Sequence, residues 1–325
     1  MRTTDEINAM ALPELFRHLS AGGLVRRLLE IARDEDLGVD PLDAAGRGGA
    51  PTGHSGDITS DCCITPERMG VGLVVARSGG VMAGLEALPM LVELFAPGCR
   101  FEVHARDGSN VGPGTTVATV RGALDELLGL ERTLLNLVGR LSGIATRTAE
   151  FVAAIPPGSR AALYDTRKTT PGLRVLEKYA VRCGGGRSHR MGLHDAVLIK
   201  DNHLTGIAIG ELAGFVSKAA ARARAIGSPT FIEVEVDTLD QFAALLELPP
   251  GVIDIVLLDN MSCEQMNAAA QRRDAVNPAL ELEASGGVTL ASLPAIAATG
   301  VDRISVGGLT HSAVSLDVAL DVEEK

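Results

Sequence analysis

Four apolar runs in the second half of the chain decide its fold: TFIEVEV (230–236), DIVLLDN (254–260), LELEASGG (280–287) and DRISVGG (302–308). Each has the length of a buried strand, and helical segments lie between most of them. Such alternation predicts a parallel sheet with helices on its faces. RAALYDT (160–166) and AVLIK (196–200) extend the pattern toward the N-terminus. We therefore expect an open (incomplete) α/β barrel of six or seven strands. No GxGxxG follows the first strand, which disfavours a dinucleotide-binding sheet.

The first half of the chain predicts a smaller domain. Three strand-like runs, VGLVVA (71–76), CRFEVHA (99–105) and TTVATVRG (115–122), accompany a helix expected at 84–94. A long helix with one apolar face follows. We assign the chain to the α/β class. The expected parts are an N-terminal α/β sandwich domain (1–130), a linking helix (125–155), an open α/β barrel (156–310) and a C-terminal tail (311–325) that packs back on the N-terminal domain. We expect residues 1–20 to be a weakly ordered lead-in and residues 40–60 a surface loop.

Composition excludes several classes of function. The net charge of −11 and the pI near 5.2 disfavour nucleic acid and anionic membranes as partners. No apolar run is long enough to span a bilayer, and the first residues do not resemble a secretory signal. The cysteine count of five is odd and no CxxC occurs, which argues against a disulfide scaffold or a thiolate zinc site. We therefore expect a cytoplasmic protein.

Positive charge gathers in one segment of this acidic chain. Between Asp165 and Lys200, eight Lys or Arg oppose three acidic residues, which indicates a site for a small anion. Arg174, Lys178 and Arg182 are spaced by four, and we interpret them mainly as a solvated helix face. GGG at 184–186 is either a helix stop or a phosphate-binding turn.

Polar residues recur at the carboxyl ends of the predicted strands, the edge of an α/β barrel that holds the active site. The cationic ones, with nearby His189, suit carboxylates and phosphates. Glycine turns can present backbone N–H groups to phosphate, and acidic residues can hold sugar hydroxyls, Mg²⁺ or a developing cation. The strand-end residues, with Arg190 from the same basic segment, are Arg167, Lys168, Arg190, Lys200, Glu235, Asp259, Ser285, Gly286, Gly287, Gly307 and Gly308. Glu233 shares one side of its strand with Glu235, and buried charges there must be functional or paired.

The longest polar runs resemble one enzyme family. DTRKTTPGLR (165–174), EKYAV (177–181), HRMGLHD (189–195) and LIKDNH (198–203) are similar to the signature of the quinolinate phosphoribosyltransferases. The resemblance continues in GDIT (56–59), ERTLLNLVGRLSGIAT (131–146), IEVEV (232–236), VLLDN (256–260), SGGV (285–288) and ISVGGLTHS (304–312). It covers the chain from about residue 20 onward.

This resemblance implies a reaction and a division of labour. The family joins quinolinate to phosphoribosyl pyrophosphate (PRPP), releasing CO₂ and pyrophosphate and forming nicotinate mononucleotide for NAD synthesis. It implies that Lys168, Lys200, Glu235 and Asp259 are catalytic, and that Glu235 and Asp259 hold Mg²⁺ directly or through water. Arg132 is expected to reach quinolinate from the partner subunit of a homodimer, which could assemble further. The implied quinolinate contacts are Arg132, Arg167, His189, Arg190 and Lys200; those to PRPP are Lys168, Glu235, Asp259, Ser285, Gly286, Gly287 and Gly307.

Two other readings stay open from the residues. A barrel aldolase would use Lys168 or Lys200 as a Schiff base, which borohydride trapping would detect. A non-catalytic, ligand-sensing relative would lack product formation, although the intact sets of acidic and cationic residues disfavour it.

Overall fold

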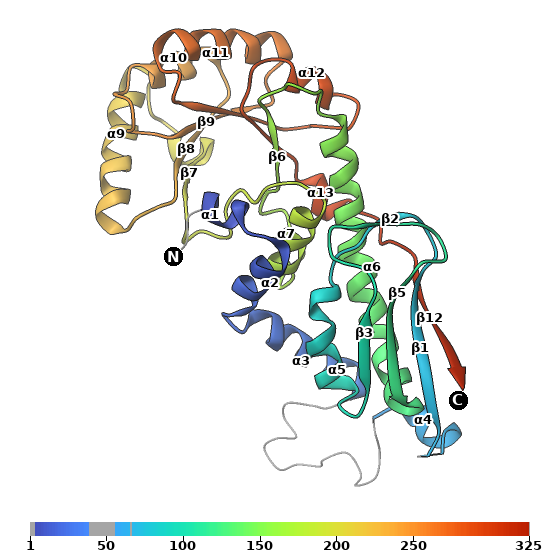
Figure 1. Cartoon of the computed structure of the whole chain (residues 1–325). Coiled ribbons are helices and arrows are strands. Elements are labelled where there is room, and N and C mark those ends of the chain that lie inside the picture. The colour runs from blue at the N-terminus through green and yellow to red at the C-terminus, as the bar shows by residue number, and fades with distance from the viewer. Residues whose placement is uncertain (1–3, 39–55, 66, 325) are drawn as a thin grey trace. The chain divides into compact units, whose positions relative to one another are not determined.

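The computed structural model describes residues 4–38, 56–65 and 67–324, which form two compact units (Figure 1). The barrel unit falls within Met1–Ala9, Thr148–Thr169 and Gly186–His311. The sheet unit falls within Met10–Arg147, Thr170–Gly185 and Ser312–Lys325. Each unit is therefore assembled from segments that are far apart in the sequence.

Six parallel strands form the sheet of the barrel unit, in the order β6-β11-β10-β9-β8-β7. Their bounds are β6 (Ala162–Tyr164), β7 (Val197–Ile199), β8 (Ile232–Val236), β9 (Ile255–Asp259), β10 (Glu281–Ser285) and β11 (Arg303–Ser305). All five residues of β8 are buried, as are the first four of β9. Because β6 and β7 are the two edges and are not paired with each other, the structure confirms the open barrel. Tyr164 also forms a parallel bridge with Arg187.

Helices cover the outside of this sheet (Figure 1). They are α9 (Ile209–Ile226), α10 (Leu239–Leu246), α11 (Cys263–Val276) and α12 (Leu293–Ala297). Thr238 and Ser262 begin α10 and α11 with capping boxes, in which each hydroxyl accepts from the backbone N–H of a glutamine three residues later. The unit also contains α1 (Thr4–Ala9), α8 (Asp201–Leu204) and α13 (Gly308–His311).

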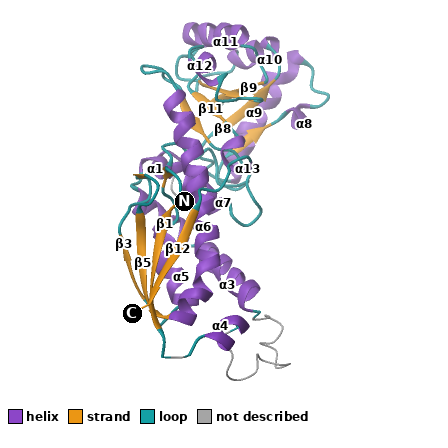
Figure 2. Cartoon of the chain, turned by 90° about the vertical axis from the view of Figure 1, so that its right-hand side faces the viewer, coloured by secondary structure: helices purple, strands orange, loops and turns teal. Residues whose placement is uncertain are grey.

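The sheet unit is built on an antiparallel sheet in the order β12-β1-β5-β3 (Figure 2). Its strands are β1 (Met69–Ala76), β3 (Arg100–Val103), β5 (Thr116–Ala123) and β12 (Val318–Glu324), and β2 (Gly80–Val81) pairs separately with β4 (Asn110–Val111). The C-terminal strand β12 runs beside β1 from Val318 opposite Ala76 to Glu324 opposite Gly70. The helices are α2 (Leu12–Ser20), α3 (Leu24–Leu37), α4 (Ile58–Cys63), η2 (Leu85–Ala87), α5 (Leu88–Phe95), most of α6 (Leu124–Ala154) and α7 (Arg174–Cys183).

Two expectations need correction. Residues 4–20 are not a weakly ordered lead-in, because they form α1 and α2, and Leu15 and Phe16 of α2 are buried. The expected surface loop lies mostly outside the described residues, but its end is helical, since Asp57 caps α4 by accepting from two backbone N–H groups. None of the described helices is long and apolar enough to cross a membrane.

Candidate active site

The residues predicted at strand ends lie there in the structure, whereas His189 and Arg190 come shortly after Arg187, which bridges to Tyr164. Arg167 and Lys168 follow β6, Lys200 follows β7, and Glu235 is the fourth residue of β8. Asp259 and Ser285 end β9 and β10, and Gly307 follows β11. Parallel strands bring these carboxyl ends to one edge of the barrel unit. Arg132 instead belongs to α6 within the sheet unit.

Lys200 and Glu235 form an ion pair across neighbouring strands. Lys200 Nζ lies 2.6 Å from Glu235 Oε2. The Lys200 side chain remains 46% exposed whereas that of Glu235 is 8% exposed, so the ammonium is accessible and its partner is fixed. His203 Nδ1 accepts from the Lys200 backbone N–H at 2.9 Å, which holds the turn into α8. The pair therefore presents a positioned cation beside an anchored carboxylate.

The loop after β6 carries Arg167 and Lys168, and the buried Asp165 at its start holds it in place. Asp165 is fully buried, and its Oδ1 accepts from the backbone N–H of His189 at 2.9 Å. Two residues later, the Nε of Arg167 is buried without a hydrogen-bond partner among the described residues. A buried guanidinium N–H without an acceptor is costly. This unmet donor is what a site for a bound carboxylate would leave.

Lys168 lies against the glycine after β11. A Cβ at Gly307 would fall 2.7 Å from Lys168 Cδ and 3.4 Å from Thr166 Oγ1. Thr310 Oγ1 donates to the Lys168 carbonyl at 2.7 Å, which ties the two loops together. A Cβ at residue 307 would require the Lys168 side chain to shift, so Lys168 and the turn after β11 lie close enough to form one cationic surface suited to phosphate.

His189 reaches into a buried charge cluster. Its Nε2 lies 2.9 Å from Glu233 Oε2 and 3.2 Å from Glu283 Oε1. Arg303 Nε donates to Glu283 Oε2 at 2.8 Å, and its guanidinium lies 3.8 Å from the centre of the Tyr164 ring. Both carboxylates are fully buried. Two anions and two cations thus neutralise one another inside the barrel.

The charges of this cluster shift its ionisation. Burial lowers the pKa of His189, but Glu283 and Glu233 outweigh burial and raise that pKa to about 10. Burial raises the pKa of Glu283, but His189 and Arg303 lower it to about 2. Burial and the charge of Glu283 raise the pKa of Glu233 above its ordinary value. His189 is therefore an imidazolium at neutral pH.

The same three residues could also be considered as metal ligands. One atom each from His189, Glu233 and Glu283 lies within 4.8 Å of the others. However, Arg303 already supplies positive charge at Glu283, and a divalent cation would have to displace His189 from its two carboxylates. The donor set fits internal ion pairing better than metal binding.

The sequence reading missed Glu283 and Arg303. Both occur inside apolar strands, as LELEA and DRISV, and a charge at an inward-facing strand position is the signal that could have found them. The same inward-facing charge is visible in the sequence at Glu233, which is therefore expected to be paired or functional. Its partner could not be named, because pairing across a barrel depends on the stagger of the strands.

Asn260 connects Asp259 to the turn after β10 by hydrogen bonds. Asn260 Nδ2 donates to Asp259 Oδ2 at 2.7 Å, and the Asn260 backbone N–H donates to the Ser285 carbonyl at 2.9 Å. Gly286 and Gly287 follow with φ of 89° and 60°, in the left-handed region that favours glycine. The end of β9 and the glycine turn are therefore held as one piece.

The structure of α7 bears on two interpretations of the basic segment. The solvated-face expectation is wrong, because Lys178 is fully buried and Arg174 and Arg182 are half-buried. Arg182 donates to the Met10 carbonyl within the sheet unit. Gly184 ends α7, and Gly185 has a φ of 85°. The glycine run thus acts as a helix stop.

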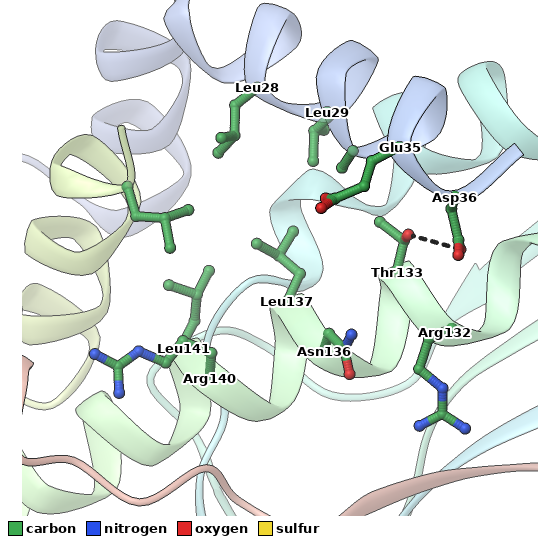
Figure 3. Close-up of a pocket in the computed structure, with 12 residues that line it drawn as sticks. Leu28, Leu29, Glu35, Asp36, Arg132, Thr133, Asn136, Leu137, Arg140 and Leu141 are labelled. Carbon is green, nitrogen blue, oxygen red and sulfur yellow. Dashed lines mark hydrogen bonds between the residues drawn. The ribbon is translucent and has the colours of Figure 1, made fainter. Parts of the chain in front are cut away.

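Arg132 lies beside two cavities of the sheet unit. One cavity of about 520 Å³ separates α3 from α6, with Leu28, Asp36 and Asn136 among its lining residues (Figure 3). Another of about 430 Å³ lies between α6 and residues 315–318. The Arg132 side chain is 66% exposed, and its guanidinium lies 3.5 Å from a carboxylate oxygen of the neighbouring Glu131. The guanidinium extends from α6 on the side away from Asp36 (Figure 3).

Comparisons with known proteins agree with this geometry. The model of the quinolinate phosphoribosyl transferase N-terminal domain matches residues 57–142, and that of the C-terminal domain matches residues 144–321. The nicotinate-nucleotide pyrophosphorylase (carboxylating) of Mycobacterium leprae (strain TN) is 44% identical over 268 residues, covering 82% of this chain and 91% of that protein. The probable enzyme of the same name from Bacillus subtilis (strain 168) is 42% identical over 270 residues, covering 82% and 88%.

Solved structures give the same result. The nicotinate-nucleotide pyrophosphorylase from Francisella tularensis matches with a TM-score of 0.77 and 32% identity, covering 93% of this chain and 96% of that one. The structure of that name from Ehrlichia chaffeensis matches with a TM-score of 0.76 and 34% identity, covering 91% and 98%.

Proposed function

This chain belongs to the quinolinate phosphoribosyl transferase family, and we propose that it transfers phosphoribosyl from PRPP to quinolinate with decarboxylation. The products are nicotinate mononucleotide, pyrophosphate and CO₂, in de novo NAD synthesis. The observation that carries this proposal is the alignment of cationic, acidic and glycine-rich strand ends along one edge of the barrel unit, in a chain matched by both domain models.

The cations select a dicarboxylate. Arg167, His189, Arg190 and Lys200 are the proposed contacts to the two carboxylates of quinolinate. The unmet Nε of Arg167 and the exposed ammonium of Lys200 support this assignment. Arginine binds carboxylates with paired N–H groups, and an imidazolium adds a further donor. Nicotinate, which has one carboxylate, should be a poor substitute because part of this cationic set would stay unpaired.

The remaining residues suit the phosphoribosyl donor. Lys168 and Gly307 form a cationic surface for phosphate, and residues 285–287 offer backbone N–H groups in a left-handed turn. Glu235 and Asp259 supply carboxylate oxygens to the ribose side. PRPP and quinolinate would then contact different sets of residues along the same edge of the barrel unit.

The chemistry follows from this placement. The bond between ribose C1 and the pyrophosphate oxygen breaks, and positive charge develops on the ribose ring. Glu235 and Asp259 stabilise that charge electrostatically. The quinolinate nitrogen, oriented by the cations, forms the new bond to C1. The ring nitrogen is then positive, so it stabilises the electron pair that stays on the adjacent ring carbon when the carboxylate leaves as CO₂, and that carbon takes up a proton.

We propose that Glu235 and Asp259 also hold Mg²⁺, directly or through water. The donor set fits this ion, since Mg²⁺ prefers oxygen ligands and is usually held by one or two carboxylates together with water and substrate phosphates. Asp259 Oδ1 has no partner among the described residues, which leaves it open to such a ligand. Bound Mg²⁺ would neutralise charge on the departing pyrophosphate. Chelation with EDTA should abolish turnover, and added Mg²⁺ should restore it.

We further propose a homodimer in which Arg132 completes the quinolinate site of the partner. The exposed guanidinium, with little internal pairing, supports this role. Arg132→Ala should raise the KM for quinolinate without lowering the melting temperature. A protein that stays monomeric at assay concentrations while turning over normally would refute the shared site. A cytoplasmic location is also proposed, because all five cysteines are free thiols.

The aldolase reading loses support from the ion pair. A Schiff-base lysine attacks as a neutral amine, whereas the Lys200 ammonium is held 2.6 Å from a buried carboxylate oxygen. Borohydride trapping with carbonyl substrates should therefore leave Lys200 unlabelled, and the same experiment tests Lys168.

The decisive assay combines the purified protein with quinolinate, PRPP and Mg²⁺ and detects nicotinate mononucleotide and CO₂. Arg167→Ala should lose this activity while keeping its melting temperature. Arg222→Ala is the matched control, because Arg222 is an exposed arginine on α9, away from the strand ends. Full activity in Arg167→Ala would remove the site assignment, and no product from the wild type would remove the proposed function.

A further inference from the structure

The backbone is unusual at one residue beside the donor site. Among the described residues, Asn260 is the one non-glycine residue with a positive φ, at 53°. Side chains other than glycine rarely adopt this conformation, although asparagine tolerates it best. Such outliers persist where the surrounding structure holds them, and they cluster at functional sites.

The side-chain amide of Asn260 lies between the Asp259 carboxylate and the glycine turn after β10. A carboxylate accepts hydrogen bonds and cannot donate, so the amide nitrogen must face Asp259, where Nδ2 donates to Oδ2 at 2.7 Å. The amide oxygen consequently faces the glycine turn, and a Cβ at Gly286 would fall 2.2 Å from Oδ1. The backbone N–H of Asn260 donates to the Ser285 carbonyl. One residue thus touches both the carboxylate and the turn assigned to PRPP.

An ordinary turn asparagine would not need this geometry. Turn asparagines commonly hydrogen-bond to nearby backbone or face solvent. Here the side chain is directed at a neighbouring carboxylate, and it occupies one of that carboxylate's two oxygens. The other, Asp259 Oδ1, has no partner among the described residues and remains available to a ligand.

We propose that Asn260 is a positioning residue for the phosphoribosyl donor, which fixes the rotation of the Asp259 carboxylate and its placement relative to the Ser285–Gly287 turn. This inference rests on the proposed function, since it gives Asn260 a part in binding PRPP. Glycine is then required at position 286 for two reasons: the backbone there has a positive φ, and a side chain would collide with the Asn260 amide. Quinolinate binding should not depend on Asn260.

Three substitutions separate the amide from the backbone. Asn260→Gly accepts the positive φ freely but removes the donor. Asn260→Asp tolerates the conformation and keeps the shape, but sets a second carboxylate against Asp259. Asn260→Ala removes the donor and adds strain. Asn267→Ala is the matched control, because Asn267 is an exposed asparagine on the neighbouring helix α11.

The readouts are the KM for PRPP, the turnover number, the Kd for quinolinate without PRPP, and the melting temperature. If the amide positions Asp259, Asn260→Gly should raise the KM for PRPP by about tenfold, the loss expected for one hydrogen bond to a charged group. Its Kd for quinolinate and its melting temperature should match those of the wild type. Asn260→Asp should bind PRPP as weakly or more weakly, and Asn267→Ala should behave as the wild type.

Two results would overturn the inference. A KM for PRPP in Asn260→Gly within twofold of the wild type would show that only the backbone conformation matters. Equal weakening of quinolinate and PRPP together with a lower melting temperature would show a structural role. The wild-type assay separates this from the proposed function: no product refutes that function, whereas normal product with an unchanged Asn260→Gly refutes only the role of Asn260.

Discussion

Replacing Glu283 by Gln tests the buried charge cluster most directly. The side chain is fully buried and contacts both Arg303 and His189. A carboxyl pKa of about 2, against an ordinary 4.5, corresponds to roughly 3 kcal/mol of folding free energy at neutral pH. Breaking a buried ion pair from one side typically costs about 3 to 5 kcal/mol. Glu283→Gln should therefore lower the melting temperature of the barrel unit by roughly 6 to 20 °C at pH 7.

The stability difference between the wild type and Glu283→Gln should depend on pH in a defined direction. Because folding lowers the pKa of Glu283, its stabilisation is complete above about pH 4.5 and is lost as the pH falls toward 2. Folding raises the pKa of His189, so its stabilisation is complete below about pH 6.5 and is lost as the pH rises through about 10. The melting difference between wild type and Glu283→Gln should therefore shrink below pH 4.5.

Thermal unfolding followed by calorimetry or circular dichroism measures this difference. Glu281→Gln is the matched control, because Glu281 lies on the same strand and contacts Arg303 at 3.3 Å, but is 48% exposed. Its effect should stay below about 1 kcal/mol. Equal melting of the two variants would refute the reasoning. If Glu283→Gln does not fold, the pKa of His189 can be measured in the wild type by nuclear magnetic resonance. A His189 ring that titrates near pH 7 would refute the proposed ion pairing with Glu233 and Glu283.

Three further predictions concern other parts of the barrel unit. Arg273 is fully buried and donates to the carbonyls of Leu280 and Gly300, so Arg273→Ala should lower the free energy of unfolding by about 3 kcal/mol or more, measured by urea denaturation. Gly307→Ala should raise the KM for PRPP more than that for quinolinate, because the new methyl displaces Lys168; equal changes in steady-state kinetics would argue against a phosphate surface there. Ser262→Ala removes the cap of α11 and should cost about 1 kcal/mol in thermal unfolding with unchanged turnover.

The strand ends could be predicted because two local signals coincide there. Runs such as DIVLLD are short and apolar, and a polar residue follows each at the point where parallel strands end. The expectation of an open barrel of six or seven strands also follows from counting six such runs. Neither inference required knowledge of a contact between distant residues.

What the sequence could not show depends on such contacts. Lys178 has the spacing of a solvated helix face, yet the sequence does not reveal that other segments cover α7. Residues 12–20 differ, because local helix signals are present there: Glu14 lies in the first turn, and Arg17 and His18 lie in the last. The positive φ of Asn260 and its closeness to Gly286 are likewise features that no local sequence pattern encodes.

The pairing of β12 with β1 has a consequence for biosynthesis. These strands are far apart in the sequence, since β1 begins at Met69 and β12 finishes at Glu324, with all six strands of the parallel sheet between them. The ribosome therefore releases every strand of the parallel sheet before the antiparallel sheet can acquire its last one. Until then β1 has an unpaired edge, which a nascent chain must keep from pairing with other chains. A premature stop shortly before Val318 would leave that edge open permanently, although every proposed active-site residue would already have been made.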